Sequence, residues 1–313
     1  MKAKLLTVGI FIFIVSLMLS CEKEVTVDLP DAERKLVVEG RIELGLPPFL
    51  MLTRSAGYFD ATDINSFEKN FVHNAVIKVS NGTTEVNLEE FCSNTLPPSL
   101  LPIVSEITGI PVENLNQVNY CIYSSFNTAI WGEAGKTYHL SIDAEEKTYT
   151  STTFIPVPVP LDSLWFEVDN DSLGFVWAKI SEPPGAINAY RWYAKRLEKD
   201  DSFIAPFGSV FDNKFVDGKT FNFGYQRDTL PNSNAPDDNN IERGYFKTGD
   251  TIVAKFCSID KNTFEFLRVY ETEVFNNGNP FASPTTIKSN IEGGALGYWG
   301  GYGPAYDTLI AVK

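Results

Sequence analysis

The sequence predicts an all-β protein with two β-sandwich domains of the immunoglobulin-like or fibronectin type III-like kind, carrying loops and short helical insertions. Short runs of alternating apolar and polar residues recur along most of the chain, and turn signals separate them. The length of 313 residues fits two domains, and 43% hydrophobic with 13% aromatic residues supplies enough apolar surface for packed cores. A disordered, collagen-like or coiled-coil chain is therefore excluded.

The first domain is predicted at residues 33–155, with at least six short strands. Its clearest hairpin signal is Asn81-Gly82, since both central residues of the favoured two-residue turn must accept a positive φ. In the run 137–142 the odd-numbered residues are polar, so His139 is expected to face solvent. The other strands of this domain are expected at 35–42, 49–54, 74–79 and 84–88.

Three prolines mark the predicted domain boundary. Pro156, Pro158 and Pro160 alternate with apolar residues, and a residue without an N–H group cannot join a central strand. We therefore expect a connector at 156–163 and a second domain at 164–313.

The second domain is predicted to have a fibronectin type III-like core with long loops. Trp177 on one strand is expected to share this core with Tyr190 and Trp192 on the next. The apolar spacing of 261–275 is compatible with one helix. Strands are expected at 164–168, 174–180, 189–196 and 251–258.

The start of the chain has the features of a signal peptide. Two lysines precede an apolar run that is short for a bilayer-spanning helix, and small Ser20 stands before Cys21. The five residues that end at Cys21 resemble a bacterial lipoprotein signal, in which the thiol accepts a diacylglycerol. We expect residues 1–20 to be removed and Cys21 to carry lipid at the start of a tether, 21–32. An ordinary secretory signal followed by a chance cysteine is the alternative.

The remaining cysteines are expected in an oxidising compartment after export. Cys92 and Cys121 flank an insertion, 93–120, that contains four prolines and a stretch compatible with one or two short helices. A disulfide between them would close the insertion and contribute about 3.5 kcal/mol of stability, while two free buried thiols are the alternative. Cys257 is expected to be a small core residue rather than a reactive thiol.

The most unusual stretch is the glycine-rich C-terminal segment 293–306. It places Tyr298, Trp299, Tyr302 and Tyr306 among six glycines. Exposed aromatic faces could bind a sugar ring, a peptide or a partner loop, so these four residues are the candidate binding residues. The alternative is that they fill the core of the second domain.

No motif in the sequence points to catalysis, a metal or a cofactor. Nucleophile-elbow, zinc-protease and phosphate-loop patterns are absent, and two histidines make a histidine-built site improbable. The acidic loops with Asp60, Asp63 and Glu68, and at 237–242, lack the order of a calcium-binding loop and are expected to be solvated. A formal net charge of −14 argues against nucleic-acid binding.

Several short motifs lie along nearly the whole mature chain. They are LVVEG at 36–40, GKTY at 135–138, TTFIP at 152–156, PPG at 183–185 with Asn188, Tyr190 and Arg191, FDN at 211–213, GKTF at 218–221 and SNIEGG at 289–294. With Cys21 and the acidic stretch after it, this set resembles an uncharacterised Bacteroidota lipoprotein family, a domain of unknown function. Members are often encoded beside TonB-dependent outer-membrane receptors, so the resemblance implies an accessory to such a transporter and no catalytic residues.

We therefore expect an outer-membrane lipoprotein that is held by its lipid and faces the extracellular side. Its expected role is ligand binding or assembly with a TonB-dependent, SusC-like receptor, without enzymatic activity and without a cofactor. A structural or adhesive surface lipoprotein with no transport role is the alternative, and a hydrolase is a further one.

Overall fold

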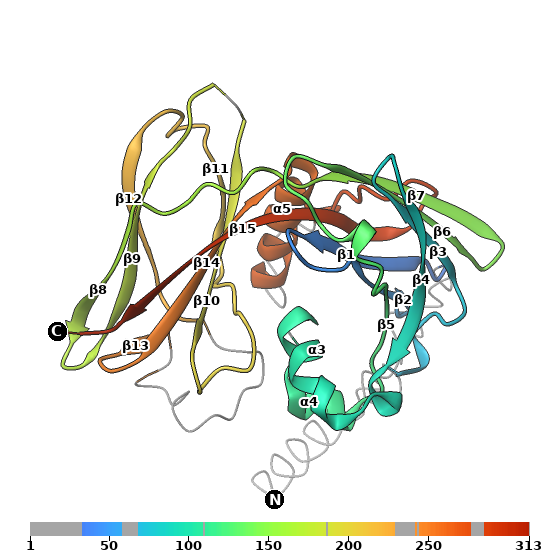
Figure 1. Ribbon diagram of the computed structural model, residues 1–313, viewed down its shortest axis with the longest axis horizontal. Coiled ribbons are helices and arrows are strands. Elements are labelled where there is room, and N and C mark those ends of the chain that lie inside the picture. The colour runs from blue at the N-terminus through green and yellow to red at the C-terminus, as the bar shows by residue number, and fades with distance from the viewer. Residues whose placement is uncertain are drawn as a thin grey trace, which may run out of the picture. The chain divides into compact units, whose positions relative to one another are not determined.

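The computed structural model describes residues 33–57, 68–108, 110–185, 187–228, 242, 244–276 and 285–312. Arg34–Lys313 forms one compact unit. The protein is mainly β, with sandwich-like sheets and few helices (Figure 1), so the predicted fold class is confirmed. None of the helices in the described ranges is long and apolar enough to cross a membrane.

The predicted strands and helices are present, with ends that differ by a few residues. The helices are α3 (Leu101–Thr108), α4 (Val112–Gln117) and α5 (Lys261–Asn276), with short 3-10 turns η1 (Ser93–Thr95), η2 (Pro98–Leu100) and η3 (Thr128–Ile130). The strands are β1 (Leu36–Glu43), β2 (Phe49–Arg54), β3 (Val76–Ser80), β4 (Glu85–Cys92), β5 (Cys121–Ser124), β6 (Thr137–Ala144), β7 (Lys147–Phe154), β8 (Ser163–Asn170), β9 (Leu173–Ser181), β10 (Ala189–Arg196), β11 (Val210–Asp212), β12 (Thr220–Tyr225), β13 (Phe246–Lys247), β14 (Thr251–Ile259) and β15 (Leu296–Ile310).

Eleven of the described strands form one continuous sheet, in the order β11-β10-β14-β15-β1-β2-β5-β4-β3-β6-β7. In a second sheet of four strands, β9 pairs with β8, β12 and β13. The parallel pair in the large sheet is β1 with β15, which brings together two segments that lie far apart in the sequence. We call β1–β7 with their core the N-terminal lobe, and β8–β14 with theirs the C-terminal lobe.

The long strand β15, red in Figure 1, belongs to both lobes. Its first residues pair with β1 and its later residues pair with β14. The sequence did not predict a strand here, because glycine and proline disfavour strands. The glycines are needed where other backbone passes: a Cβ on Gly301 would lie 2.2 Å from the carbonyl oxygen of Phe154, and one on Gly303 would lie 2.2 Å from that of Pro156. The predicted connector at 156–163 stays a prediction, but the end of the chain contributes to the lobes on both sides of it.

The core of the N-terminal lobe forms where the large sheet folds over on itself. Apolar side chains of β1 and β2 meet those of β3, β6 and β7, including the fully buried Val38, Leu50 and Ile77. Trp299 of β15 completes this core. His139 on β6 is exposed, as predicted.

The core of the C-terminal lobe lies between β10 and β14 of the large sheet and the four-stranded sheet. Tyr190 and Trp192 on β10 meet Val176 and Ile180 on β9 there. The prediction that Trp177 shares this core is wrong, because its ring lies on the other face of β9 and stacks on Trp165 with 6.3 Å between ring centroids. Both faces of β9 carry apolar residues, so alternation in the sequence could not select the buried face.

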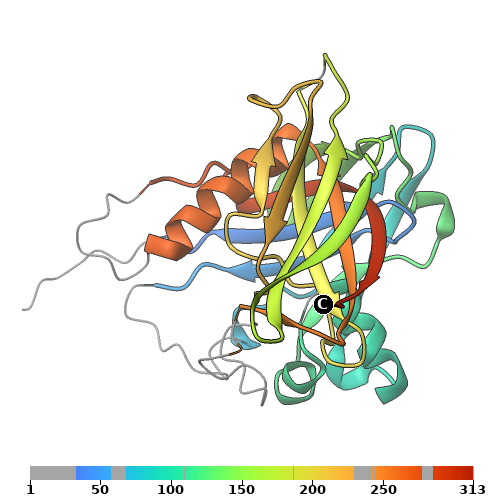
Figure 2. The same ribbon diagram turned by 90° about the vertical axis from the view of Figure 1, so that its left-hand side faces the viewer.

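Helix α5 covers the opposite face of β10, β11 and β15, away from the small sheet (Figures 1 and 2). Leu267 of α5 packs there against Cys257 and Tyr302, so Cys257 is buried as predicted. Asp260 caps the helix, since its Oδ1 accepts hydrogen bonds from the N–H groups of Asn262 (2.9 Å) and Thr263 (3.1 Å).

Candidate functional site

Several of the short motifs that the sequence analysis singled out converge on one buried carboxylate. Glu182 is 3% exposed. It accepts hydrogen bonds from the side-chain amides of Asn188 (2.7 Å) and Asn213 (3.0 Å), from the Tyr190 hydroxyl (3.1 Å) and from the N–H of Gly218 (2.9 Å). Burial, and after it the Glu182 charge, raises the pKa of Tyr190 above its ordinary value, which keeps this hydroxyl a donor. These motif residues therefore fix the loops around β10.

The four candidate aromatic residues of the C-terminal segment do not form one surface. Trp299 is fully buried, and the side chain of Asn290 bonds both its N–H (2.9 Å) and its carbonyl oxygen (2.8 Å). Tyr302 is 3% exposed under α5. The prediction of a ligand platform is wrong for these two, because their rings fill cores; Trp299 fills the core of the N-terminal lobe rather than the second. Tyr298 is partly buried, and Tyr306 is exposed.

The insertion 93–120 is closed at its base by a disulfide. Cys92 and Cys121 face each other as partners on β4 and β5, and their sulfurs are 2.03 Å apart. Inside the insertion α3 and α4 bury Leu101 and Leu115. The Ser93 hydroxyl donates to the carbonyl oxygen of Val118 (3.1 Å), which adds a second tie beside the bridge.

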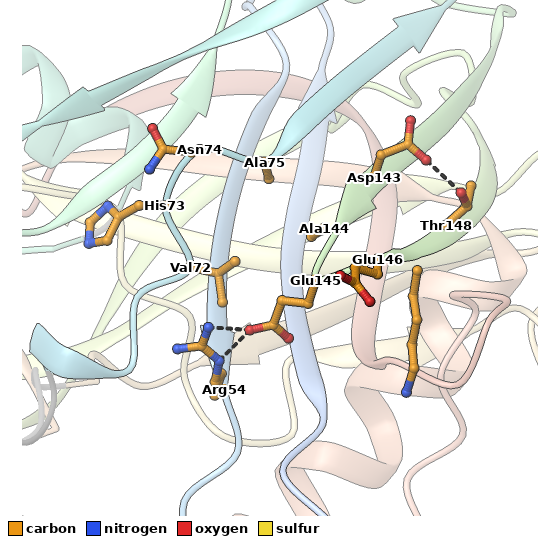
Figure 3. Close-up of a pocket in the computed structure, with 11 residues that line it drawn as sticks. Arg54, Val72, His73, Asn74, Ala75, Asp143, Ala144, Glu145, Glu146 and Thr148 are labelled. Atoms are coloured by element: carbon orange, nitrogen blue, oxygen red, sulfur yellow. Dashed lines mark hydrogen bonds and ion pairs between the residues drawn. The ribbon is translucent and has the colours of Figure 1, made fainter.

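An open cavity of about 370 Å³ lies beside this base, at the edge of the N-terminal lobe. Figure 3 shows its walls: Arg54 at the end of β2 pairs with Glu145 in the β6–β7 turn, and the Thr148 hydroxyl donates to Asp143 at 2.5 Å. The remaining lining residues are Val72, His73, Asn74, Ala75, Ala144, Glu146 and Lys147. The cavity is lined by charges of both signs, which suits a polar partner better than an apolar one.

Three non-glycine residues that line this cavity have a backbone conformation that usually favours glycine. The φ angles are 59° at Asn74, 53° at Glu145 and 63° at Glu146. Glu145 and Glu146 form the two-residue turn between Ala144 and Lys147, where asparagine and glycine are the usual residues. The sequence gives no turn signal at this position, so the cavity could not be predicted from it.

The cavity and the insertion meet at Glu90 of β4. His73, which lines the cavity, bonds one carboxylate oxygen of Glu90 through its Nδ1, and the N–H of Asn74 donates to the other (3.1 Å). The hydroxyl of Tyr123 also donates to Glu90 (3.2 Å). Burial by itself would raise the pKa of Glu90, but the hydrogen bonds from His73, Asn74 and Tyr123 hold it below the ordinary value. The hydrogen bonds of His73 and Asn74 to Glu90 therefore connect the cavity wall to the strand that carries the disulfide.

The same place holds the one set of donor atoms in the described part of the chain that could suit a metal ion. His73, Glu90, Cys92 and Cys121 have donor atoms within 4.8 Å of one another. The two sulfurs are joined to each other, however, and a disulfide sulfur is not the thiolate that zinc requires. Only one histidine nitrogen and one carboxylate remain, which is too few ligands for a structural or catalytic zinc ion.

Some sequence-based predictions fall on residues outside the described ranges. Cys21, the signal peptide and the acidic residues Asp60, Asp63 and 237–240 are among them. Glu68 is described, and its carboxylate accepts the N–H of Asn119 (2.6 Å), so it helps to hold the end of the insertion.

The fold and these sites define a mainly β protein of two sandwich-like lobes whose candidate site is an open polar cavity. The chain belongs to the family described as "Domain of unknown function (DUF4249)", whose model matches residues 22–306. No curated protein matches the chain. Among solved structures, a two-domain fibronectin type III segment from chicken tenascin is 11% identical and covers 88% of this chain and 99% of its own length. Its TM-score of 0.19 is too low to support an argument.

Proposed function

We propose that this chain is an exported lipoprotein, anchored by lipid at Cys21 in the outer membrane of a Bacteroidota cell and facing outward. In this proposal it acts as a ligand-binding or assembly subunit of a TonB-dependent, SusC-like transporter. The observation that carries export is the disulfide between Cys92 and Cys121, because stable disulfides form in oxidising compartments. The signal-like residues 1–20 and the resemblance described above support the anchor and the partner.

The proposed mechanism is capture close to the receptor. Two acyl chains confine the protein to the membrane plane, and tethering raises the effective concentration at the receptor to roughly millimolar. Weak polar contacts are then sufficient for function. The open cavity and the insertion are the surfaces that we assign to this contact, because they adjoin at Glu90 and the disulfide fixes one to the other.

Purification of the tagged protein from its native membranes tests this function. We expect a TonB-dependent receptor to be recovered with it, and we expect metabolic labelling with palmitate to mark the wild type but not Cys21→Ala. A labelled protein that is repeatedly recovered alone would favour the second candidate, a structural or adhesive lipoprotein without a transport role. An unlabelled wild-type protein found in the medium would contradict the anchor itself.

A further inference from the structure

A second open cavity, of about 780 Å³, lies in the C-terminal lobe between β11 and α5. Three segments that are distant in the sequence line it: residues of 210–215, one face of α5 at 264–269, and residues of 286–288. Helix α5 lies beside β11 (Figure 1). The volume is in the range of pockets that hold a small ligand, and no lining residue is shared with the cavity at the edge of the N-terminal lobe.

This cavity carries an excess of positive charge. Its lining has three cations, Lys214, Arg268 and Lys288, and two carboxylates, Asp212 and Glu265. The charged residues next to the lining do not cancel the excess, because they are two of each sign: Lys219, Lys261, Asp217 and Glu273. The whole chain has a formal net charge of −14, so a local positive excess is unusual for it. The cavity therefore attracts a negatively charged ligand.

An exposed aromatic ring lies beside the cations. Phe215 lines the cavity and is 79% exposed. The ammonium nitrogen of Lys214 is 5.6 Å from the centre of this ring, and on α5 the guanidinium carbon of Arg268 is 6.0 Å from the centre of the Phe264 ring. A ligand that combines a negative group with a flat apolar face can thus contact a cation and a ring together.

The loop that carries Lys214 and Phe215 is fixed at both ends by the buried carboxylate of Glu182. The side-chain amide of Asn213 donates to one of its oxygens (3.0 Å), and the N–H of Gly218 donates to the other (2.9 Å). Within the loop a further N–H, that of residue 216, donates to the carbonyl oxygen of Asn213 (2.9 Å). Binding at a loop that is already ordered costs less conformational entropy, so this wall of the cavity is prepared for a ligand.

The two carboxylates of the lining define the rest of the ligand. Asp212 accepts the N–H of Lys214 at 3.3 Å, and Glu265 pairs with Lys261 at 3.6 Å. Each carboxylate has a second oxygen that can accept a further hydrogen bond. An ionised carboxylate repels a second anion but binds a hydroxyl group well, since it can only accept. The ligand should therefore carry hydroxyl groups as well as its negative charge.

We propose that this cavity binds a saccharide that contains a uronic acid residue. The cations bind the carboxylate of the sugar, the Phe215 ring contacts the C–H face of the sugar ring, and Asp212 and Glu265 accept hydrogen bonds from the sugar hydroxyls. An acid without hydroxyl groups leaves these two carboxylates facing it without a donor. A neutral sugar leaves the positive excess without a partner.

The inference goes beyond the proposed function and does not depend on the lipid anchor or on a receptor, so the two proposals fail separately. Trigalacturonate is the probe, and its binding to the purified full chain is measured by calorimetry. The trimethyl ester of trigalacturonate has the same rings without the charge, so it tests the need for the carboxylates. Pentaglutamate has carboxylates without sugar rings, so it tests whether an acidic peptide binds equally well.

Three variants change the lining: Lys214→Gln, Arg268→Gln and Phe215→Ala. Two matched controls lie outside it. Lys179→Gln replaces another exposed lysine, on β9, and Phe126→Ala replaces another exposed phenylalanine, at 74% exposure. The replaced lysines, arginine and phenylalanines are all exposed, so we expect the variants to fold, and the thermal midpoint without ligand verifies this.

We expect saturable binding of trigalacturonate to the wild type and to both controls. Lys214→Gln and Arg268→Gln should bind it at least about fivefold more weakly, since each loses a charged donor, and Phe215→Ala should lose about as much with the ring contact. The proposal is overturned by the absence of saturable binding to the wild type or by lining variants that bind as tightly as the controls. Binding of the ester or of pentaglutamate as tight as that of trigalacturonate would also overturn it.

Discussion

Removing one partner of a buried ion pair between the two lobes should destabilise the protein, whereas removing both partners should not. Lys255 of β14 bonds Glu43 of β1 at 2.6 Å, and the side chains are only 10% and 5% exposed. The hydroxyl of Tyr306 donates to the second oxygen of Glu43 (2.9 Å). The test is Lys255→Met, Glu43→Met and the double substitution.

The magnitudes follow from what each substitution leaves behind. Lys255→Met leaves the Glu43 carboxylate buried with Tyr306 as its remaining side-chain donor, so we expect a loss of about 3–5 kcal/mol in the free energy of unfolding. Glu43→Met leaves the Lys255 ammonium beside the rings of Tyr193 and Phe203, each 5.4 Å away, which offsets part of a similar loss. The double substitution removes both charges, so we expect it to lie within about 1 kcal/mol of the wild type.

Urea unfolding followed by tryptophan fluorescence measures these values, and the three variants with the wild type form a double-mutant cycle. The exposed pair Lys78–Glu85, at 3.7 Å with side chains 44% and 60% exposed, is the control, and Lys78→Met should cost less than about 1 kcal/mol. The reasoning is refuted if the double substitution costs the sum of the two single ones, or if Lys255→Met costs no more than Lys78→Met.

Three further predictions concern the bridge, a glycine and a carboxylate. Replacing Cys92 and Cys121 by serine should lower the free energy of unfolding by about 3.5 kcal/mol, because the disulfide closes a loop with a sequence separation of 29 residues. A reductant should lower the urea midpoint of the wild type but not that of the variant. Gly297→Ala should lower the free energy of unfolding, measured by thermal unfolding, by about 3 kcal/mol or more, because a Cβ there would lie 1.9 Å from the carbonyl oxygen of Val38. Gly294 has nearly the same φ but open space around it, so Gly294→Ala should lower the free energy of unfolding by only about 1 kcal/mol. Equal losses in the two variants would contradict the clash. The lowered pKa of Glu90 means that this carboxylate stabilises the protein above the ordinary pKa of 4.5, and that the stabilisation is lost as the pH falls through the folded-state pKa. Urea midpoints measured against pH should therefore vary less in Glu90→Gln than in the wild type. The same pH profile in both proteins would argue against this contribution of Glu90.

Where the chemical signal is local, the sequence predicted structure well. The strand at 49–54 and the strand at 189–196 have the ends that were expected, and the helix at 261–275 differs by one residue at its end. Alternation and helical spacing are properties of neighbouring residues, so they can be recognised in the sequence without knowledge of the tertiary contacts. One or two short helices were also expected in the insertion, and the structure has two there, α3 and α4. The disulfide expected at the base of the insertion is present.

The candidate sites were harder to predict, because each depends on contacts between distant segments. The aromatic residues of β15 looked like a surface platform, but pairing of β15 with β1 turns Trp299 into the core of the N-terminal lobe. The polar cavity requires a turn of two glutamates in an unusual conformation. The junction at Glu90 also has no signature in the local sequence.

The sequence by itself determined the fold class, most of the strands and the features from which we infer export. Tertiary structure decided which face of β9 is buried, and it decided that the last strand pairs in parallel with the first. The physical reason is that the hydrogen-bond pairing of β15 with β1 joins residues separated by most of the chain, while glycines that weaken a strand locally are required there for close backbone contacts. Local strand propensity cannot predict a contact between residues so far apart in the sequence.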